Sequence, residues 1–136
     1  MKKLKTVRYL IADRIRRTRK TDVFLREDFS GFAAYDVVGR ELRKLVGEGV
    51  LVRVGYGLYA RAKRSVLSGK PIPIAPLIGI GYQALRRLGY SPKPSRAALD
   101  YIEGRSMQVP AGDRIAVPGA RVKRRIAFGP RVIEYA

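Results

Sequence analysis

The fold is decided by residues 34–61, which read AYDVVGRELRKLVGE over 34–48 and GVLVRVGYGLYAR over 49–61. The apolar side chains of the first part recur at helical spacing and predict a helix from about Ala34 to Glu48 with one buried face. They are Val37, Val38, Leu42, Leu45 and Val46. The glycines that follow end this helix, and two short β-prone runs around Gly55-Tyr56-Gly57 predict a hairpin.

Upstream of this stretch, the sequence predicts one longer helix, a short strand and a short helix. Lys3 to about Arg17 has helical spacing of apolar residues. The stripe consists of Leu4, Val7, Leu10, Ile11 and Ile15. Val23-Phe24-Leu25 is expected as a strand, and Asp28 to Gly31 as a brief helix, with Phe29 and Phe32 in the core. Helix, short helix, long helix and glycine-tipped hairpin is the order of a winged helix-turn-helix, which is expected from about Phe24 to Arg61 within a domain of residues 1–62.

Downstream, the pattern predicts a second, small α+β lobe, so the fold class is α+β. Residues 63–76 are rich in serine, glycine and proline and are interpreted as a linker. The lobe, residues 77–136, begins with a helix from Leu77 to Gly89. A second helix is expected from Ser95 to Glu103, capped by Ser95 and burying Ala98, Leu99 and Ile102. Short runs punctuated by glycine and proline then predict a β-meander. The runs are Met107 to Val109, Arg114 to Val117, Arg124 to Phe128 and Val132 to Tyr135.

The charge of the chain points to a polyanion partner. The formal net charge is +18 over 136 residues, and residues 1–68 and 69–136 carry +10 and +8. Twenty of the 29 cations are arginine, whose planar fork binds phosphate and guanine edges with two hydrogen bonds. No apolar run reaches the roughly 18 residues of a bilayer span, and the only basic amphipathic helix has a narrow apolar stripe. The expected partner is therefore nucleic acid rather than a membrane, and the expected location is the cytoplasm.

Twelve residues are candidates for contact with double-stranded DNA. The polar face of the long helix is expected in the major groove, the hairpin is expected to act as the wing, and a cationic cluster after the first helix is expected to hold phosphate. These sets are Tyr35, Asp36, Arg40, Arg43 and Lys44; Arg53, Tyr56 and Arg61; and Arg16, Arg17, Arg19 and Lys20. Two alternatives stay open: the cationic cluster is a solvated helix end, or Tyr56 stacks on unpaired bases. Tyr59 is expected in the core.

Catalytic chemistry has little support in the sequence. The chain has no cysteine and no histidine, which excludes thiolate sites and removes the commonest metal ligand and general base. The adjacent pair Glu27-Asp28 is interpreted as helix capping. Asp100 and Glu103 lie one turn apart and have the spacing to hold Mg²⁺, but a face that balances nearby arginines is the preferred interpretation. We therefore expect no enzyme, no catalytic residue, no cofactor and no metal.

Two segments resemble the AbiEi family of type IV antitoxins and related AbiEi-like transcriptional regulators. The first matches the family's N-terminal winged-helix signature, and the second resembles its small second domain, where a Gln-Val-Pro segment precedes a hairpin. The matching residues are Phe29, Tyr35-Asp36-Val37, Leu42, Leu45-Val46, Gly49-Val50, Arg53 and Gly57-Leu58-Tyr59, then 104–110, Arg124-Arg125-Ile126, Gly129-Pro130 and Val132-Ile133-Glu134. Ala33-Ala34 departs from the family, which often has a cap residue there.

The resemblance implies an antitoxin that represses its own operon and neutralises a nucleotidyltransferase toxin without obligatory stable contact. Two other classes remain open. An RNA-binding or ribosome-associated protein also suits this charge. A module whose second lobe docks on a toxin or nuclease predicts an exposed apolar patch, although the same side chains are the preferred core of that lobe. They are Ile126, Phe128, Val132 and Ile133. The oligomeric state is not determined by the sequence.

Overall fold

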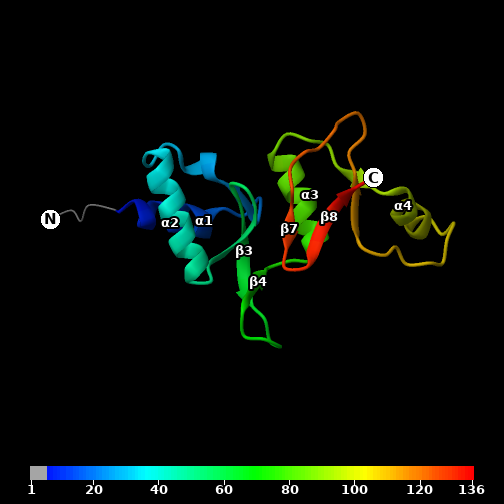
Figure 1. The fold of residues 1–136 in the computed structure, drawn as a ribbon, viewed down its shortest axis with the longest axis horizontal. Helices are drawn as coiled ribbons and strands as arrows, with labels where there is room; N and C mark the ends of the chain where they lie inside the picture. The colour runs from blue at the N-terminus through cyan, green and yellow to red at the C-terminus, as the bar shows by residue number, and fades with distance from the viewer. Residues whose placement is uncertain (1–5) are drawn as a thin grey trace. The chain divides into compact units, whose positions relative to one another are not determined.

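The computed structural model describes residues 6–136 and has an α+β fold (Figure 1). Its described part contains four α-helices and two sheets. The chain divides into two compact units, Met1–Ile74 and Ala75–Ala136. Each unit has one sheet with helices packed on it. Within the described residues, no helix has the length and apolar character needed to cross a membrane.

The first unit places two helices and a 3-10 helix against an antiparallel sheet. Its elements are α1 (Val7–Arg17), β1 (Val23–Leu25), η1 (Arg26–Phe29), α2 (Tyr35–Gly47), β2 (Leu51–Gly55), β3 (Leu58–Arg64) and β4 (Pro71–Pro73). β3 is central: it pairs with β1 and β2 through its first residues and with β4 through its last three. The expected helices and hairpin are present, with α1 starting at Val7, while Lys3 and Leu4 lie outside the described residues.

The core of this unit explains the helical spacing read from the sequence. Val38, Leu42 and Leu45 of α2 are buried on one side of the helix, against Phe29 and the sheet. The expectation that Phe29 and Tyr59 are core residues is confirmed, and Phe32 is half-buried at the core's edge. The remaining members of the core cluster are Ile11, Ile15, Phe24 and Leu51. Burial of this apolar face determines which side of α2 is exposed.

The expected linker of residues 63–76 is wrong for most of its length. Ala62 to Arg64 pair in antiparallel register with Pro71 to Pro73, so this segment forms a second hairpin that belongs to the first unit. The prolines suit an edge strand, where a missing N–H breaks no ladder hydrogen bond on the open side. Their abundance suggested a linker because proline is otherwise rare in sheets. The first unit therefore extends to Ile74 rather than ending at residue 62.

The second unit packs α3 on a four-stranded sheet. Its elements are α3 (Leu77–Arg87), β5 (Lys93–Pro94), α4 (Arg96–Ile102), β6 (Asp113–Ala116), β7 (Ala127–Phe128) and β8 (Arg131–Tyr135). Ile80, Ala84 and Leu85 of α3 are buried, as are Ile115 of β6 and Ile133 of β8. Both strands lie under α3, which is close enough that a glycine is needed at position 81.

The expected β-meander is wrong. The strand order is β5-β6-β8-β7, and β6 pairs with β8 in parallel, whereas a meander is antiparallel throughout. Residues 107–109 form no strand, and Met107 and Val109 are exposed. Short β-prone runs do not reveal which runs pair, because pairing depends on contacts between distant residues.

The short helix α4 lies where the sequence predicted it, but the predicted burial of its apolar residues is wrong. Ser95 caps it as expected, since its hydroxyl accepts a hydrogen bond from the Ala98 N–H at 3.3 Å. None of the α4 residues is buried, however, and Ile102 is 70% exposed. In contrast, Ile126 and Ile133 are buried, while Phe128 and Val132 are half-buried, so these four serve mainly as core of the lobe.

Two glycines of α3 provide a matched test of its packing. A Cβ at Gly81 would lie 2.9 Å from Ile133 Cδ1 and 3.0 Å from Ile115 Cδ1, whereas a Cβ at Gly79 meets no atom within 4 Å. We expect Gly81→Ala to lower the free energy of unfolding by about 1–3 kcal/mol through overpacking. Gly79→Ala should leave it unchanged or raise it by up to about 1 kcal/mol, because alanine favours the helix. Urea denaturation followed by circular dichroism measures both, and equal effects would contradict the close packing of α3.

Candidate nucleic-acid interface

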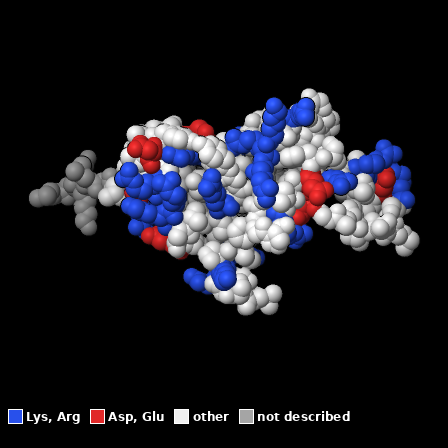
Figure 2. Space-filling model, viewed as in Figure 1, with Lys and Arg blue, Asp and Glu red and all other residues white. Residues whose placement is uncertain are grey.

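The side of α2 opposite the core carries a polar row. Asp36, Arg40 and Arg43 follow one another at i, i+4 and i+7, and all three are exposed. Lys44 lies beside them and forms an ion pair with Glu41 at 3.2 Å. Figure 2 shows lysine and arginine side chains gathered over the part of the first unit where Figure 1 draws α2. The four charged residues predicted for the groove face therefore share the exposed side of one helix.

The first turn of α2 is held by Arg26, the first residue of η1. Ala34 precedes the helix and provides no side-chain cap. Arg26 Nε instead donates to the Tyr35 carbonyl at 2.9 Å, and its guanidinium lies 3.4 Å from the centroid of the Tyr35 ring. The same guanidinium covers Gly39, where any Cβ would collide with it. Gly39 is buried for this reason, although it is one helical turn from an exposed tyrosine.

Arg26 was missed by the sequence reading. It lies in a short segment with no apolar period, and its partner is a backbone carbonyl nine residues away. The available signal was indirect: a glycine inside a strongly amphipathic helix costs about 1 kcal/mol relative to alanine, so it needs a packing reason. Gly39 is that glycine, and the guanidinium of Arg26 is the reason.

The turn between β2 and β3 is joined to the start of α2. The Arg26 N–H donates to the Gly57 carbonyl at 3.1 Å, and Gly57 has a φ of 62°, which favours glycine in this tight turn. Tyr35 and Tyr56 are 52% and 69% exposed and share a side-chain hydrogen bond. That bond raises the pKa of the Tyr35 phenol above its ordinary value, against the opposing positive charge of Arg26. The helix and the turn thus form one continuous surface.

Arg53 belongs to the same surface. Arg53 lies two residues after Leu51 on β2, so the two side chains are on the same face of the sheet. Leu51 belongs to the core cluster on that face. Its side chain is exposed, and its Nε donates to the Gly55 carbonyl at 3.2 Å. The guanidinium stays 6.0 Å from the ring centroid of Tyr56. Of the three residues predicted for the hairpin contact, Arg53 and Tyr56 are therefore beside the start of α2.

Arg61, the third, does not lie on this surface. Its guanidinium donates to the carbonyl oxygens of Ile15 and Thr18 at the end of α1, and to the Thr21 carbonyl at 2.8 Å. It also pairs with the Asp22 carboxylate at 3.0 Å and lies over the Phe24 ring. The structure therefore does not bring Arg61 together with Arg53 and Tyr56, because this side chain binds the end of α1 to the sheet.

The cationic cluster after α1 adjoins Arg61 rather than the α2 row. Arg16 and Arg17 are exposed, and both pair with Asp13, Arg17 at 3.4 Å. The hydrogen bond from Arg16, with the charges of both arginines, holds the pKa of Asp13 below its ordinary value. Arg19 and Lys20 are exposed beyond the helix end. Two of the four predicted phosphate contacts, Arg16 and Arg17, are therefore partly neutralised.

The carboxylates of the second unit are balanced by arginines, as the preferred interpretation held. Asp100 accepts from Arg105 Nε at 3.0 Å and pairs with Arg96 at 3.4 Å, while Glu103 also pairs with Arg105. Asp28 likewise acts as a cap, accepting from the Leu25 N–H at 2.9 Å. Across residues 6–136, no group of three or more acidic side chains is arranged to hold a metal ion.

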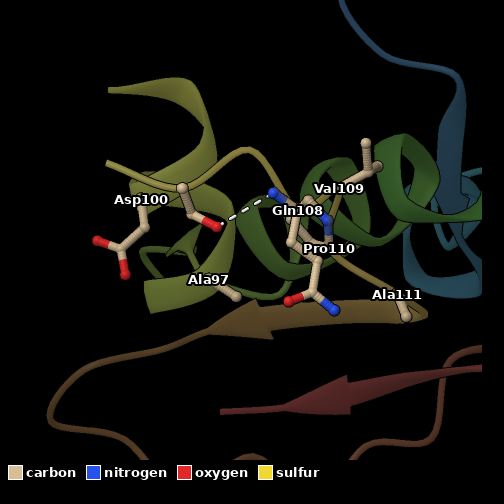
Figure 3. Close-up of a pocket in the computed structure, with 7 residues that line it drawn as sticks. Ala97, Asp100, Gln108, Val109, Pro110 and Ala111 are labelled. Atoms are coloured by element: carbon tan, nitrogen blue, oxygen red, sulfur yellow. Dashed lines mark hydrogen bonds between the residues drawn. The ribbon is translucent and has the colours of Figure 1, made fainter. Parts of the chain in front are cut away.

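A cavity of about 250 Å³ lies between α4 and the loop that contains Gln108-Val109-Pro110 (Figure 3). The Gln108 N–H donates to the Ser106 hydroxyl at 3.2 Å and shapes this loop. The one ionised side chain in the lining, Asp100, faces the arginines just described. The Gln108-Val109-Pro110 segment, which is part of the family resemblance, therefore forms one wall of this cavity. The one charged side chain of the cavity, Asp100, is already paired with arginine.

Removal of the Arg26 side chain tests its role at the start of α2. We expect Arg26→Ala to speed amide exchange at Val38 and Gly39 about tenfold, since it removes hydrogen bonds and a cation–π contact worth about 1–2 kcal/mol together. Arg26→Lys keeps the charge without the planar fork and should restore only part of the protection. Unchanged exchange in the alanine variant would show that the helix start is held by other contacts.

The pKa of Tyr35 tests the link between the helix and the turn. The hydrogen bond with Tyr56 favours the protonated phenol, so its stabilising effect is complete below about pH 10 and is lost as the pH rises through the raised pKa. Tyr56→Phe should move the Tyr35 pKa back toward its ordinary value in an NMR titration of the ring. Tyr101→Phe, in the second unit, is the matched control. A Tyr35 pKa that is the same in the Tyr56→Phe variant as in the unmodified chain would exclude the hydrogen bond between Tyr35 and Tyr56.

Comparison with known proteins places both units in one family. A protein-family model matches residues 10–135, and it describes a family of unknown function, DUF6088. Searches of curated proteins and of solved structures give no match. The matched range begins within α1 and extends to the last strand, β8, so it covers the α2 surface and the second sheet together. The chain therefore belongs to the DUF6088 family.

Proposed function

We propose that this chain binds double-stranded DNA as a winged helix-turn-helix protein, with α2 in the major groove and the β2–β3 turn as the wing. The observation that carries the proposal is the exposed row of Asp36, Arg40 and Arg43 on α2, next to Tyr35 and Tyr56. The order α1, β1, η1, α2, β2, β3 supports it, as does the sheet order β1-β3-β2. The order of elements is the one expected for a winged helix.

The chemistry of the row suits base recognition. α2 has 13 residues and is about 20 Å long, and a major groove about 12 Å wide admits such a helix. Arginine binds the O6 and N7 atoms of guanine with two hydrogen bonds, and a carboxylate accepts from the amino group of cytosine. Arg40 and Arg43 have the first capability, and Asp36, one turn earlier on the same side of α2, has the second. Arg53 and the half-neutralised cluster at the end of α1 would serve phosphate.

The finer proposal is a repressor of the AbiEi antitoxin type that autoregulates a type IV toxin–antitoxin operon in the cytoplasm. Its support is the resemblance of two segments to that family. Several of the matching residues have structural roles, since Phe29, Leu42 and Tyr59 are buried and Gly57 forms a turn. They support the fold more than the activity. A nucleotidyltransferase toxin is the partner that this proposal implies, and the chain itself is proposed not to be an enzyme.

RNA binding is the second candidate, favoured by one observation. Tyr35 and Tyr56 expose two aromatic rings beside two arginines, and stacking on unpaired bases uses such surfaces. Competition between duplex DNA and a structured RNA at fixed salt separates the two candidates. Competition is needed because added salt weakens both complexes. Preference for the RNA would favour RNA binding as the function.

The α2 row is tested with Arg40→Ala/Arg43→Ala and the duplex that lies upstream of the chain's own gene. We expect a loss of about 1–3 kcal/mol for each arginine that reads guanine, measured by fluorescence anisotropy. If the two residues read bases, the slope of affinity against salt should stay near that of the unmodified chain. If they contact phosphate, the slope should fall by about 0.9 for each.

The matched control is Arg96→Ala/Arg105→Ala, which removes the same charge from residues that pair with carboxylates. It should bind nearly as the unmodified chain does. Binding that is unaffected by Arg40→Ala/Arg43→Ala would overturn the assignment of the α2 row to the groove.

A further inference from the structure

The hairpin of β3 and β4 ends in two fully exposed aliphatic side chains. Val66 is 100% exposed and Leu67 is 96% exposed, at the tip formed by residues 65–70. Single apolar side chains on a surface are ordinary, but here two neighbours lie together at the tip of a protruding hairpin (Figure 1). Valine is also a poor turn former, so local propensity does not explain its presence there.

The tip is held in shape by its own hydrogen bonds. The Ser65 N–H donates to the Lys70 carbonyl and the Gly69 N–H to the Ser65 carbonyl, both at 2.9 Å. The Ser65 hydroxyl accepts from the N–H groups of Leu67 and Ser68 at 3.2 and 3.3 Å. Gly69, with a φ of 73°, makes the turn possible. Little ordering entropy is therefore left to lose when Val66 and Leu67 contact a partner.

The charge around the tip favours a polyanion. Residues 49–99 contain nine lysines and arginines and no aspartate or glutamate. Three of these cations lie on the hairpin and are exposed, namely Lys63, Arg64 and Lys70. Arg64 Nη1 also donates to the Gly69 carbonyl at 2.9 Å, which keeps its charge beside the tip. The charged side chains of the hairpin that carries the two aliphatic groups are thus all positive.

We propose that this tip enters the minor groove of the bound duplex, where Val66 and Leu67 act as an apolar wedge at a base step. Lys63, Arg64 and Lys70 contact the phosphates beside the wedge. Apolar side chains used in this way unstack a step and bend the duplex toward the major groove. The inference rests on the proposed function, since it extends the DNA surface of the first unit beyond α2 and the β2–β3 turn.

The hairpin projects beyond the part of the sheet that pairs with β2. Three residue pairs, from Ala62–Pro73 to Arg64–Pro71, continue β3 past its pairing with β2 and carry the tip about 10 Å further. A membrane is the less suitable partner, because two aliphatic side chains bury less area than the single acyl chain that gives only marginal binding.

The test compares Val66→Ser/Leu67→Ser with Val66→Ile/Leu67→Met in the full chain. The probe is an upstream duplex of about 30 base pairs with a fluorescent dye at each end, so that energy transfer reports bending. We expect the unmodified chain and the Ile/Met variant to bend the duplex. The serine variant should bind about tenfold more weakly and leave the duplex straight, since two buried aliphatic groups are lost. Both positions are exposed in the fold, so circular dichroism should be unchanged in either variant.

Each outcome separates the wedge from the proposed function. A serine variant that binds and bends as the unmodified chain does overturns the wedge and leaves the α2 proposal standing. If the serine variant binds more weakly and the Arg40→Ala/Arg43→Ala variant binds as the unmodified chain does, the wedge is supported and the assignment of the α2 row to the groove is overturned. If the unmodified chain leaves the duplex unbent but sediments with vesicles of phosphatidylcholine and phosphatidylserine, and the serine variant does not, the tip binds membranes and the wedge is wrong.

Discussion

The burial of one side of α2 is the constraint on which the first unit depends. Val38, Leu42 and Leu45 fill the space between Phe29 and the sheet, so the helix has a single orientation about its own axis. A helix held in this way presents Asp36, Arg40 and Arg43 outward at fixed spacing. The positions of the exposed arginines are therefore fixed by the core side chains on the opposite face of α2, because a close-packed core prevents the helix from rotating about its axis.

A second constraint acts at the N-terminal end of α2. Ala34, which precedes α2, provides no side-chain cap, and the first turn is bound by a guanidinium from the preceding 3-10 helix. The same residue reaches the β2–β3 turn through its backbone N–H. Arg26 therefore joins three segments that are separate in the chain. Its packing over Gly39 also shows that a positive side chain can be a structural part of a surface that is otherwise available to an anion.

The two units differ in how their sheets are completed. In the first, β3 is long enough to pair with three strands, and its far end carries a hairpin whose apolar tip is displayed rather than packed. In the second, the loop between β6 and β7 allows β8 to return in parallel beside β6, under α3. Gly81 permits that close approach of helix and sheet. Both units remain strongly basic, and local ion pairs such as those of Asp13 and Asp100 offset part of the repulsion within each.

The sequence alone determined α2, the β2–β3 hairpin, the α+β class and the exposure of Arg40 and Arg43, because amphipathic spacing and glycine turns act over only a few residues. The structure decided what depends on distant partners. It turned Arg61 inward to the end of α1, brought Arg26 to Tyr35, paired proline-rich β4 with β3 and set β6 parallel to β8. Long arginine side chains and short strands have many possible partners of similar local energy, and only packing of the whole unit selects among them.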